Sequence, residues 1–316
     1  MSCFLEHAGA TPSESASLSF TDGEQIVLGL NVQSTGQGHA TVFGQLVADR
    51  LGIPLSQVLH RQGDTNQGLA GAASVGSRSA ITAGSAIVGT IEVMLAKGRK
   101  LASTLLEAAE TDIQYRNGGF EVVGTDRRLS LFEVAARAKE LVARGQAPDG
   151  LDTKEMRDTP QAFPNGCHIA EVEIDPDTGQ VTVLAYTAVD DCGTVLDAMI
   201  VQGQIHGAVA QGLGQALMEN GLYEPEGGQF VAGSFMDYAM PRAPDMPLVM
   251  RDANHPSPAT TNPLGVKGVG EAGTTAALAA IMNAIGHAVP NGAAAHLDMP
   301  ATPAKVWAAC RRAMAK

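Results

Sequence analysis

Residues 262–275 read NPLGVKGVGEAGTT, and they run directly into an apolar segment, AALAAIMNAIGHAV, with the composition of a helix. The loop contains four glycines, and glycine permits both a positive φ and the close approach of other groups. The amides at the start of the following helix have no intrahelical partners and favour anions. Glu271 lies inside this run. We therefore expect the loop to hold a phosphate-bearing cofactor and to present Glu271 to its reactive end.

The composition indicates a folded protein of one large or two ordinary domains. The chain has 316 residues, of which 45% are hydrophobic and 17% are charged, so a sizeable core is expected and disorder is not. The formal net charge of −12 argues against a nucleic-acid or anionic-membrane partner. A phosphate ligand would then be held by backbone amides. The N-terminus shows no secretory signal, and no uninterrupted apolar run is long enough to span a bilayer.

The four cysteines, at positions 3, 167, 192 and 310, form no C-x-x-C pair. The sequence therefore encodes neither an iron–sulfur cluster nor a zinc ribbon. We expect free thiols in a reducing cytoplasm.

The first half, taken as a domain of residues 1–150, alternates strands and helices. Its periodicities predict strands at 16–20, 25–31, 57–62 and 120–123, and helices at about 42–51, 80–109 and 130–145. Asp22-Gly23 is a hairpin signal, and Ser130 with Glu133 forms a capping box. Residues 3–5 look like a strand with no earlier partner, which suggests that they belong with a segment before them.

The second half, taken as a domain of residues 151–316, repeats this plan. Residues 146–162 are polar, contain prolines and show no period, so we predict a domain linker there. The remaining pattern predicts a hairpin at 169–174 and 180–189, a helix at 200–217, one or two strands within 229–240, a helix after Glu271, and a last helix capped by Thr302-Pro303. The expected fold is α+β, with two similar lobes of mixed sheet and long helices.

Gly36-Gln37-Gly38-His39 follows a predicted strand and opens a predicted helix, and Asp64 ends the next strand. This spacing fits a nicotinamide-dinucleotide fold. However, Thr41 stands where the third glycine is required, and the preceding strands form an antiparallel hairpin instead of a parallel crossover. A simple glycine turn before a helix explains the residues equally well.

Three other motifs also have two explanations each. The loop AASVGSR, at residues 72–78, suits a phosphate or pterin edge, or is a solvated loop with a serine N-cap. Glycines 203, 207, 212 and 214 fall on or near a helix, where each costs up to about 1 kcal/mol relative to alanine. Either helix packing or an approaching ligand, with Gln211 bonded to a heterocycle, offsets that cost. Glu271 is either a functional acid or a charge that stabilises the helix dipole. His39, His168 and His206 have no mutual ligand spacing.

Six segments together resemble one family, the molybdenum hydroxylases, which include xanthine dehydrogenase, aldehyde oxidase and the aerobic carbon-monoxide dehydrogenase large subunit. The segments are GQGHATVFGQLVADRLGIP, GDT, GSRSAITAGSA, AVDDCGTVLDAMIVQGQIHGAVAQGLGQAL, GSFMDYAMPRA and TNPLGVKGVGEAGTTAALAAIMNAI. The likeness covers nearly the whole chain, in order, and is strongest to the bacterial carbon-monoxide-dehydrogenase-like branch. It extends only to the C-terminal, molybdopterin-binding part of that subunit.

The resemblance implies a role for each matching position. Glu271 matches the catalytic glutamate, which acts as a general base. The implied cofactor contacts are Gln37, Gly38, Ala72, Ala73, Ser74, Ser77, Arg78, Cys192, Gly193, Gln211, Lys267, Gly268, Val269 and Gly270. Arg78 and residues 190–193 lie where the nucleotide end of a molybdopterin cytosine dinucleotide is expected. The cofactor's dithiolene would hold molybdenum, so no protein ligand to the metal is implied.

The resemblance also implies partners for this chain. These are the N-terminal molybdopterin-binding half, an Fe–S subunit and a FAD subunit, in a cytoplasmic oligomer that oxidises an aldehyde, an N-heteroaromatic or a similar small substrate. The chain would be inactive without the N-terminal part. The alternatives are a fragment or assembly module that packs on a partner without cofactor, and an NAD-dependent dehydrogenase.

Overall fold

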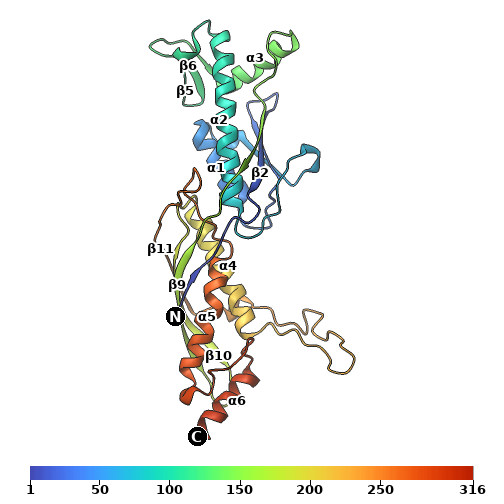
Figure 1. Ribbon diagram of the computed structural model, residues 1–316, viewed down its shortest axis with the longest axis vertical. Helices are drawn as coiled ribbons and strands as arrows, with labels where there is room; N and C mark the ends of the chain where they lie inside the picture. Colours follow the sequence, from blue (N-terminus) through green and yellow to red (C-terminus); the bar gives the residue numbers. More distant parts are fainter. Residues whose placement is uncertain (316) are drawn as a thin grey trace. The chain divides into compact units, whose positions relative to one another are not determined.

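The computed structural model describes residues 1–315 as two compact units (Figure 1). The amino unit consists of Gly9–Ala162 and Ala259–Val266. The carboxy unit consists of Met1–Ala8, Phe163–Pro258 and the chain from Lys267 onward. The division of the sequence at residue 150 stays a prediction.

A four-stranded mixed sheet and two long helices form the centre of the amino unit. The elements are β2 (Ser13–Phe20), β3 (Ile26–Leu30), α1 (His39–Leu51), β4 (Val58–Gln62), α2 (Ser79–Leu105) and β8 (Thr153–Asp158). The strand order is β4-β3-β2-β8. β2 and β3 pair as the predicted antiparallel hairpin, whereas β3 and β4 are parallel and joined through α1. α2 packs against β2 and β8.

Alternation along β2 explains how this sheet acquires a core face. Ala16, Leu18 and Phe20 point inward and are buried, as expected for every second residue of a strand. α2 is long and apolar enough to cross a bilayer by composition, but 67% of that window is buried inside the protein. Its apolar character therefore serves the core of the unit.

A small antiparallel sheet and one helix complete the amino unit. They are β5 (Ile113–Arg116), β6 (Gly119–Val122), β7 (Arg128–Ser130) and α3 (Leu131–Ala143), with short 3₁₀ turns at Leu55–Gln57, Thr65–Gln67 and Glu110–Asp112. The capping box is confirmed: Glu133 N donates to Ser130 Oγ at 3.1 Å, and Ser130 N donates to Glu133 Oε2 at 2.7 Å.

The carboxy unit also has a four-stranded mixed sheet with helices packed on it. Its elements are β1 (Ser2–Leu5), β9 (Asn165–Ile174), β10 (Val181–Asp191), α4 (Ala198–Leu217), β11 (Val249–Asn254), α5 (Ala272–Ala288) and α6 (Pro303–Met314), with 3₁₀ turns at Ala243–Asp245 and Pro290–Gly292. The strand order is β1-β9-β10-β11. β9 and β10 are antiparallel, β10 and β11 are parallel, and α5 packs on β9 and β1.

The two units share one plan, which confirms the prediction of an α+β fold with similar lobes. Each contains an antiparallel hairpin, a helix, a strand parallel to the hairpin's second strand, and a second helix over the hairpin. In each, an antiparallel edge strand completes the sheet beside the hairpin's first strand.

Four expectations from the sequence need correction. The predicted linker at 146–162 contains β8, which pairs with β2. β1 does have a partner, but that partner is β9, later in the chain. Residues 229–240 form no strand and contribute only the isolated bridge between Tyr223 and Phe230. β2 and β3, the strands before Gly36, form the expected antiparallel hairpin, but β3 and β4 on either side of α1 are parallel, so the sheet does contain the crossover that we expected to be missing.

Two glycines set the close packing of α4 against α5. A Cβ atom added at Gly212 would lie 2.6 Å from the Cβ of Ala277 on α5. In return, a Cβ atom at Gly273 would lie 2.8 Å from the Cβ of Ala208 on α4. These contacts show that helix packing requires Gly212. Gly203 and Gly207 have nothing within 4 Å, so packing within the unit does not require them.

We expect Gly212→Val to lower the free energy of unfolding by about 1–3 kcal/mol, because the added atoms overlap α5. Gly207→Ala is the matched control on the same helix. It should raise the free energy of unfolding by up to about 1 kcal/mol, because alanine favours the helix and meets no neighbour. Urea denaturation of the two variants measures both changes. Equal effects of the two substitutions would contradict the packing account.

Candidate functional site

In the amino unit, the structure brings together the two loops in which we expected cofactor contacts. Gln37 Nε2 donates to Ser74 Oγ at 3.0 Å, which joins the loop before α1 to the loop before α2. Asn31, which directly follows β3, donates from its Nδ2 to the carbonyl of Ala72, at 3.2 Å. Gln37 Oε1 also accepts from Thr35 N within its own loop. Residues 37 and 72–74 thus form one local surface of this unit.

Backbone conformation in these loops is specialised. Gly38, the N-cap of α1, has φ +76°, and Gly76 has φ +57°. Ser77 follows with φ +50°, a value that a residue with a Cβ atom adopts only when its surroundings impose it, and such residues are concentrated at functional sites. Neither α1 nor α2 has a side-chain cap at its N-terminus.

Arg78 does not lie at the surface, as contact with a nucleotide would require. Its side chain is fully buried, and its Nη1 donates to Glu14 Oε2 at 2.7 Å. The remaining donors bond to the carbonyls of Ala10, Thr11, Ser13, Ala72 and Ala73. In this structure the guanidinium therefore supports the 72–78 loop from inside the amino unit and has no exposed surface for a ligand.

Our sequence analysis missed Glu14, the partner of Arg78. Glu14 is fully buried, and burial raises the pKa of its carboxyl despite the opposing effect of Arg78. A Cβ atom at Gly71 would lie 2.1 Å from Glu14 Oε1, so the loop passes directly over this pair. The alternation of β2 could have identified it, because Glu14 occupies the same inward-facing series of positions as Ala16 and Leu18.

His39 begins α1 and is 5% exposed. Its ring lies 5.0 Å from that of Phe43, and its Nδ1 finds no hydrogen-bond partner among residues 1–315. Burial, with a smaller contribution from the charge of nearby His60, lowers the pKa of His39 to about 4. His39 is therefore neutral at pH 7 and belongs to the core.

In the carboxy unit, one carboxylate joins the loops that carry the remaining expected contacts. Asp191, at the end of β10, accepts from Lys267 Nζ at 2.6 Å and from the backbone amides of Gly193 and Ser257, each at 2.9 Å. The Lys267 amide donates to the carbonyl of Cys192 at 2.8 Å. Lys267 is thus held through both its backbone and its side chain. These two bonds fix the first residue of the segment 267–270.

The electrostatics of this carboxylate support that role. Burial alone would raise the pKa of Asp191, but the bonds from Lys267, Ser257 and Gly193 outweigh it and hold the pKa below its ordinary value. Burial also raises the pKa of the neighbouring Cys192 thiol to about 11. At pH 7, Asp191 is charged and Cys192 is neutral.

Glu271 is the N-cap residue of α5 and is exposed. Its carbonyl accepts from Thr275 N and Thr275 Oγ1. Gln211, also exposed, lies across from the first turn of α5, where Thr274 Oγ1 donates to Gln211 Oε1 at 3.5 Å and to the carbonyl of Ala208 at 2.8 Å. The α4–α5 contact therefore places Gln211 close to the turn that presents Glu271.

The histidines form no metal site. His168 is buried between Tyr186 and Asp190, at 2.8 and 3.0 Å, and His206 bonds to Asp252 at 2.9 Å. No group of three or more His, Cys, Asp or Glu side chains among residues 1–315 has the arrangement of a metal site.

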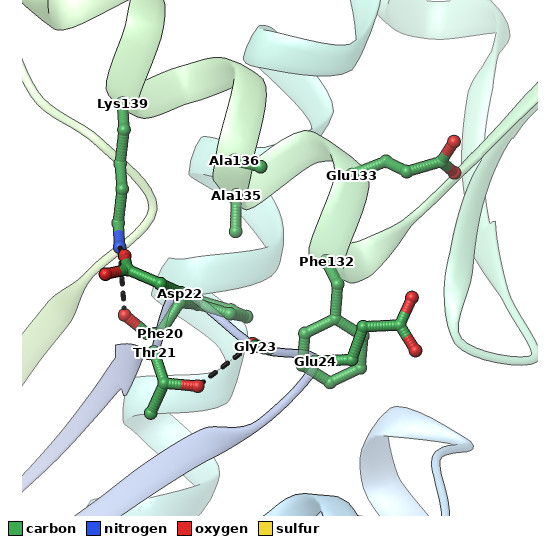
Figure 2. Close-up of a pocket in the computed structure, with 10 residues that line it drawn as sticks. All are labelled: Phe20, Thr21, Asp22, Gly23, Glu24, Phe132, Glu133, Ala135, Ala136 and Lys139. Carbon is green, nitrogen blue, oxygen red and sulfur yellow. Dashed lines mark hydrogen bonds and ion pairs between the residues drawn. The ribbon is translucent and has the colours of Figure 1, made fainter.

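The amino unit contains a cavity of about 360 Å³ away from these loops, between the β2–β3 turn and α3 (Figure 2). Lys139 reaches across it and donates to the carbonyl of Phe20 at 3.1 Å and to Asp22 at 3.4 Å. None of the expected site residues lines this cavity, so it does not form part of the candidate site.

Comparison with known proteins gives a consistent family assignment. Residues 1–247 match the family model described as molybdopterin cofactor-binding domain. The chain is 36% identical over 315 residues to the 6-hydroxypseudooxynicotine dehydrogenase complex subunit gamma of Paenarthrobacter nicotinovorans. That match covers 97% of this chain and 39% of the relative.

Two solved structures agree in fold. The reconstituted CO dehydrogenase from Oligotropha carboxidovorans superposes with a TM-score of 0.87 at 28% identity, over 99% of this chain and 40% of that one. Quinoline 2-oxidoreductase from Pseudomonas putida 86 gives a TM-score of 0.83 at 32% identity, over 98% and 41%. This chain thus spans about two-fifths of the length of these relatives.

We expect the free energy of unfolding to fall by about 2 kcal/mol between pH 7 and pH 5 through His39 alone. The pKa of His39 is lowered from 6.5 to about 4 in the folded chain, so over this range only the unfolded chain takes up the proton. The loss should begin as the pH drops below 6.5 and end near pH 4. Urea denaturation at several pH values tests this: His39→Phe should remove this part of the slope, and the exposed-site control His287→Gln should keep it.

We expect Asp191→Asn to lower the free energy of unfolding by about 1–3 kcal/mol, because the Lys267 ammonium loses its charged acceptor. Amide hydrogen exchange should also become faster in residues 267–273. Asp177→Asn makes the same charge change at an exposed position in the β9–β10 turn and should alter neither quantity. Unchanged exchange at 267–273 would mean that Asp191 does not hold this loop.

Proposed function

The chain belongs to the family of molybdopterin cofactor-binding domains, and from that premise we propose that it forms the catalytic, molybdopterin-binding part of a molybdenum hydroxylase large subunit. The observation that carries the proposal is the position of Glu271, on a glycine-rich turn at the start of α5, the helix whose first turn contacts Gln211 through Thr274. The reaction class is oxidation of a small substrate by insertion of a hydroxyl group derived from water.

The helix N-termini support binding of a phosphorylated cofactor. α1, α2 and α5 each begin at a loop with expected contacts, and each lacks a side-chain cap. Ser130 and Asp197 cap α3 and α4 with their side chains, and α6, which has no expected contact, also lacks a side-chain cap. Backbone amides at helix starts bind anions without basic side chains, which suits a chain with a net charge of −12.

The chemistry of the available side chains fits a cofactor that holds its own metal. The residues of the two loop clusters are mostly glycine, alanine, serine and glutamine, which donate and accept hydrogen bonds but are poor metal ligands. When bound, the molybdenum cofactor supplies the redox chemistry and activates the water-derived oxygen. The protein's task is then to hold the pterin and supply an acid–base group.

Each cluster has its own share of this task in the proposal. In the amino unit, Gln37, Gly38, Ala72, Ala73, Ser74 and Ser77 hold the cofactor by amide and hydroxyl groups. In the carboxy unit, Cys192, Gly193, Gln211, Lys267, Gly268, Val269 and Gly270 do so. We now assign Arg78 a positioning role, because its donors already bond to Glu14 and to loop carbonyls.

Glu271 acts as general base in this proposal. A carboxylate in this position can accept a proton from a group within hydrogen-bond reach. The Lys267–Asp191 bond fixes one end of its loop, and the Gly273–Ala208 contact fixes the helix that follows. Because the chain is held on both sides of Glu271, the carboxylate keeps its orientation and the loop does not have to reorganise during the reaction.

Several finer features belong to the same proposal. The cofactor is the cytosine dinucleotide form, electrons pass to Fe–S and FAD subunits, and the oligomeric assembly is cytoplasmic. The remaining part of the large subunit contributes the rest of the pocket, and the substrate class includes aldehydes and N-heteroaromatics. A cofactor-free assembly module that packs on a partner subunit is the competing function for the isolated chain.

The test is to measure molybdenum and cytidine in the purified complete assembly, together with turnover of aldehydes, purines, N-heteroaromatics and carbon monoxide. We expect near-stoichiometric molybdenum and cytidine in the wild type. Glu271→Gln should keep both and lose at least 99% of turnover, because an amide accepts no proton; one general base contributes about 10²–10⁴-fold. Glu173→Gln, exposed on β9, is the matched control and should leave the molybdenum content, the cytidine content and the turnover unchanged.

Each result bears on a different part of the proposal. Turnover near wild type in Glu271→Gln would remove Glu271 from the mechanism. An assembly without molybdenum would favour the cofactor-free module.

A further inference from the structure

Residues 219–248, here called the arm, carry exposed large apolar side chains at a higher density along the chain than the rest of the carboxy unit. Figure 1 shows the arm as a long loop between the end of α4 and β11. Eight of its large apolar side chains are exposed: Leu222, Tyr223, Phe230, Val231, Phe235, Met236, Met240 and Leu248. The arm contains GSFMDYAMPRA, a segment to which the proposed function gives no role.

The arm has a defined local structure. Tyr223 and Phe230 form an antiparallel bridge with ring centroids 5.1 Å apart. The amide of Glu224 donates to the carbonyl of Gln229 at 2.8 Å, and that of Val231 to Leu222 at 2.9 Å. This part is a small hairpin whose bonds are made without any neighbouring segment.

A second turn presents the two most exposed apolar side chains of the arm. Ser234 Oγ donates to Asp237 Oδ2 at 2.7 Å, which closes a turn around Phe235 and Met236. These side chains are 79% and 92% exposed. Tyr238 then donates to Glu219 Oε2 at 2.6 Å, which ties the turn to the end of α4. The arm thus holds an aromatic ring and a thioether outward on an anchored turn, as a preformed interface anchor does.

The charge of the arm indicates its partner. It carries five carboxylates, on Glu219, Glu224, Glu226, Asp237 and Asp245, against one cation, Arg242. No Lys, Arg or His side chain among residues 1–315 forms an ion pair with any of them. Two copies of so acidic a surface repel each other, which disfavours a second copy of this chain and favours a partner with a basic rim.

The length comparison indicates where such a partner exists. This chain spans 39% of the subunit gamma relative, so most of the polypeptide in a protein of that kind lies outside this chain. We propose that the arm is a docking element that inserts Phe235 and Met236 into an apolar groove with a basic rim on that remaining part of the large subunit. This inference rests on the proposed place of the chain within such a subunit.

The test is purification of the complete assembly through a tag on this chain, with the remaining part of its large subunit co-expressed as a separate polypeptide. Co-purified partner is quantified by gel densitometry, and the mass of the complex by light scattering. We expect an equimolar complex with the wild type. Phe235→Ser/Met236→Ser should retain at least tenfold less partner, because it removes both apolar anchors.

Two further variants separate docking from folding. Met156→Ser/Val123→Ser removes comparably exposed apolar groups outside the arm and should stay within twofold of wild type. Glu226→Lys reverses one charge of the arm, leaves Phe235 and Met236 in place and should weaken retention at least twofold at low salt, with the difference closing at 0.5 M salt as charges are screened. Circular dichroism and thermal melting of each isolated variant establish that it is folded.

Three outcomes would overturn the inference. They are equal retention of partner by the arm variant, no complex with the wild type, and a wild-type homodimer that Phe235→Ser/Met236→Ser dissociates. Molybdenum and cytidine are measured in the same complex, so loss of cofactor from an intact complex would count against the proposed function alone. If the wild-type assembly binds cofactor and the arm variant no longer forms the complex, the result supports the docking role alone.

Discussion

The contact between α4 and α5 is the constraint on which the candidate site of the carboxy unit depends. Gly212 and Gly273 let the two helices approach until the Cβ atoms of Ala277 and Ala208 fill the space that a side chain would need. This contact fixes the first turn of α5, and therefore Glu271 and its neighbour Thr274. Asp191 completes the arrangement by holding Lys267, so the loop before Glu271 is fixed at its other end. Packing and electrostatics thus act on the same few residues.

The amino unit solves a similar problem with a buried charge. Arg78 and Glu14 are both fully buried, and burial of a charge pair costs several kcal/mol per ion unless hydrogen bonds compensate. Arg78 offsets that cost by donating to the carbonyl of Ala72 in the 72–78 loop and to the carbonyl of Thr11 in the segment before β2. The loop then keeps left-handed conformations at Gly76 and Ser77 that it would not hold alone. We infer that conformational definition of this loop is what the pair supplies.

Local patterns were sufficient for the hairpins, the helices and the capping box, because each depends on residues close in sequence. β8 was missed because it is an edge strand with mostly exposed residues, so it shows no alternation. The arm looked like strands because its aromatic and apolar residues favour them, yet it lacks a neighbouring strand. The local sequence around Arg78 suggests a phosphate ligand. Its actual partner, Glu14, lies 64 residues earlier, so the local sequence does not reveal the ion pair. The position of Glu271 followed from its glycines, whereas the role of Asp191 required the fold.

The placement of β1 affects how the protein is made. β1 belongs to the sheet of the carboxy unit, and Leu5 pairs with Asn165, which lies 160 positions later in the chain (165 − 5). β1 is therefore synthesised well before β9, and Gly9–Ala162 of the amino unit is synthesised in between. The edge of the β9–β10 hairpin stays open until the two segments meet, and such long-range closures are slow steps in folding.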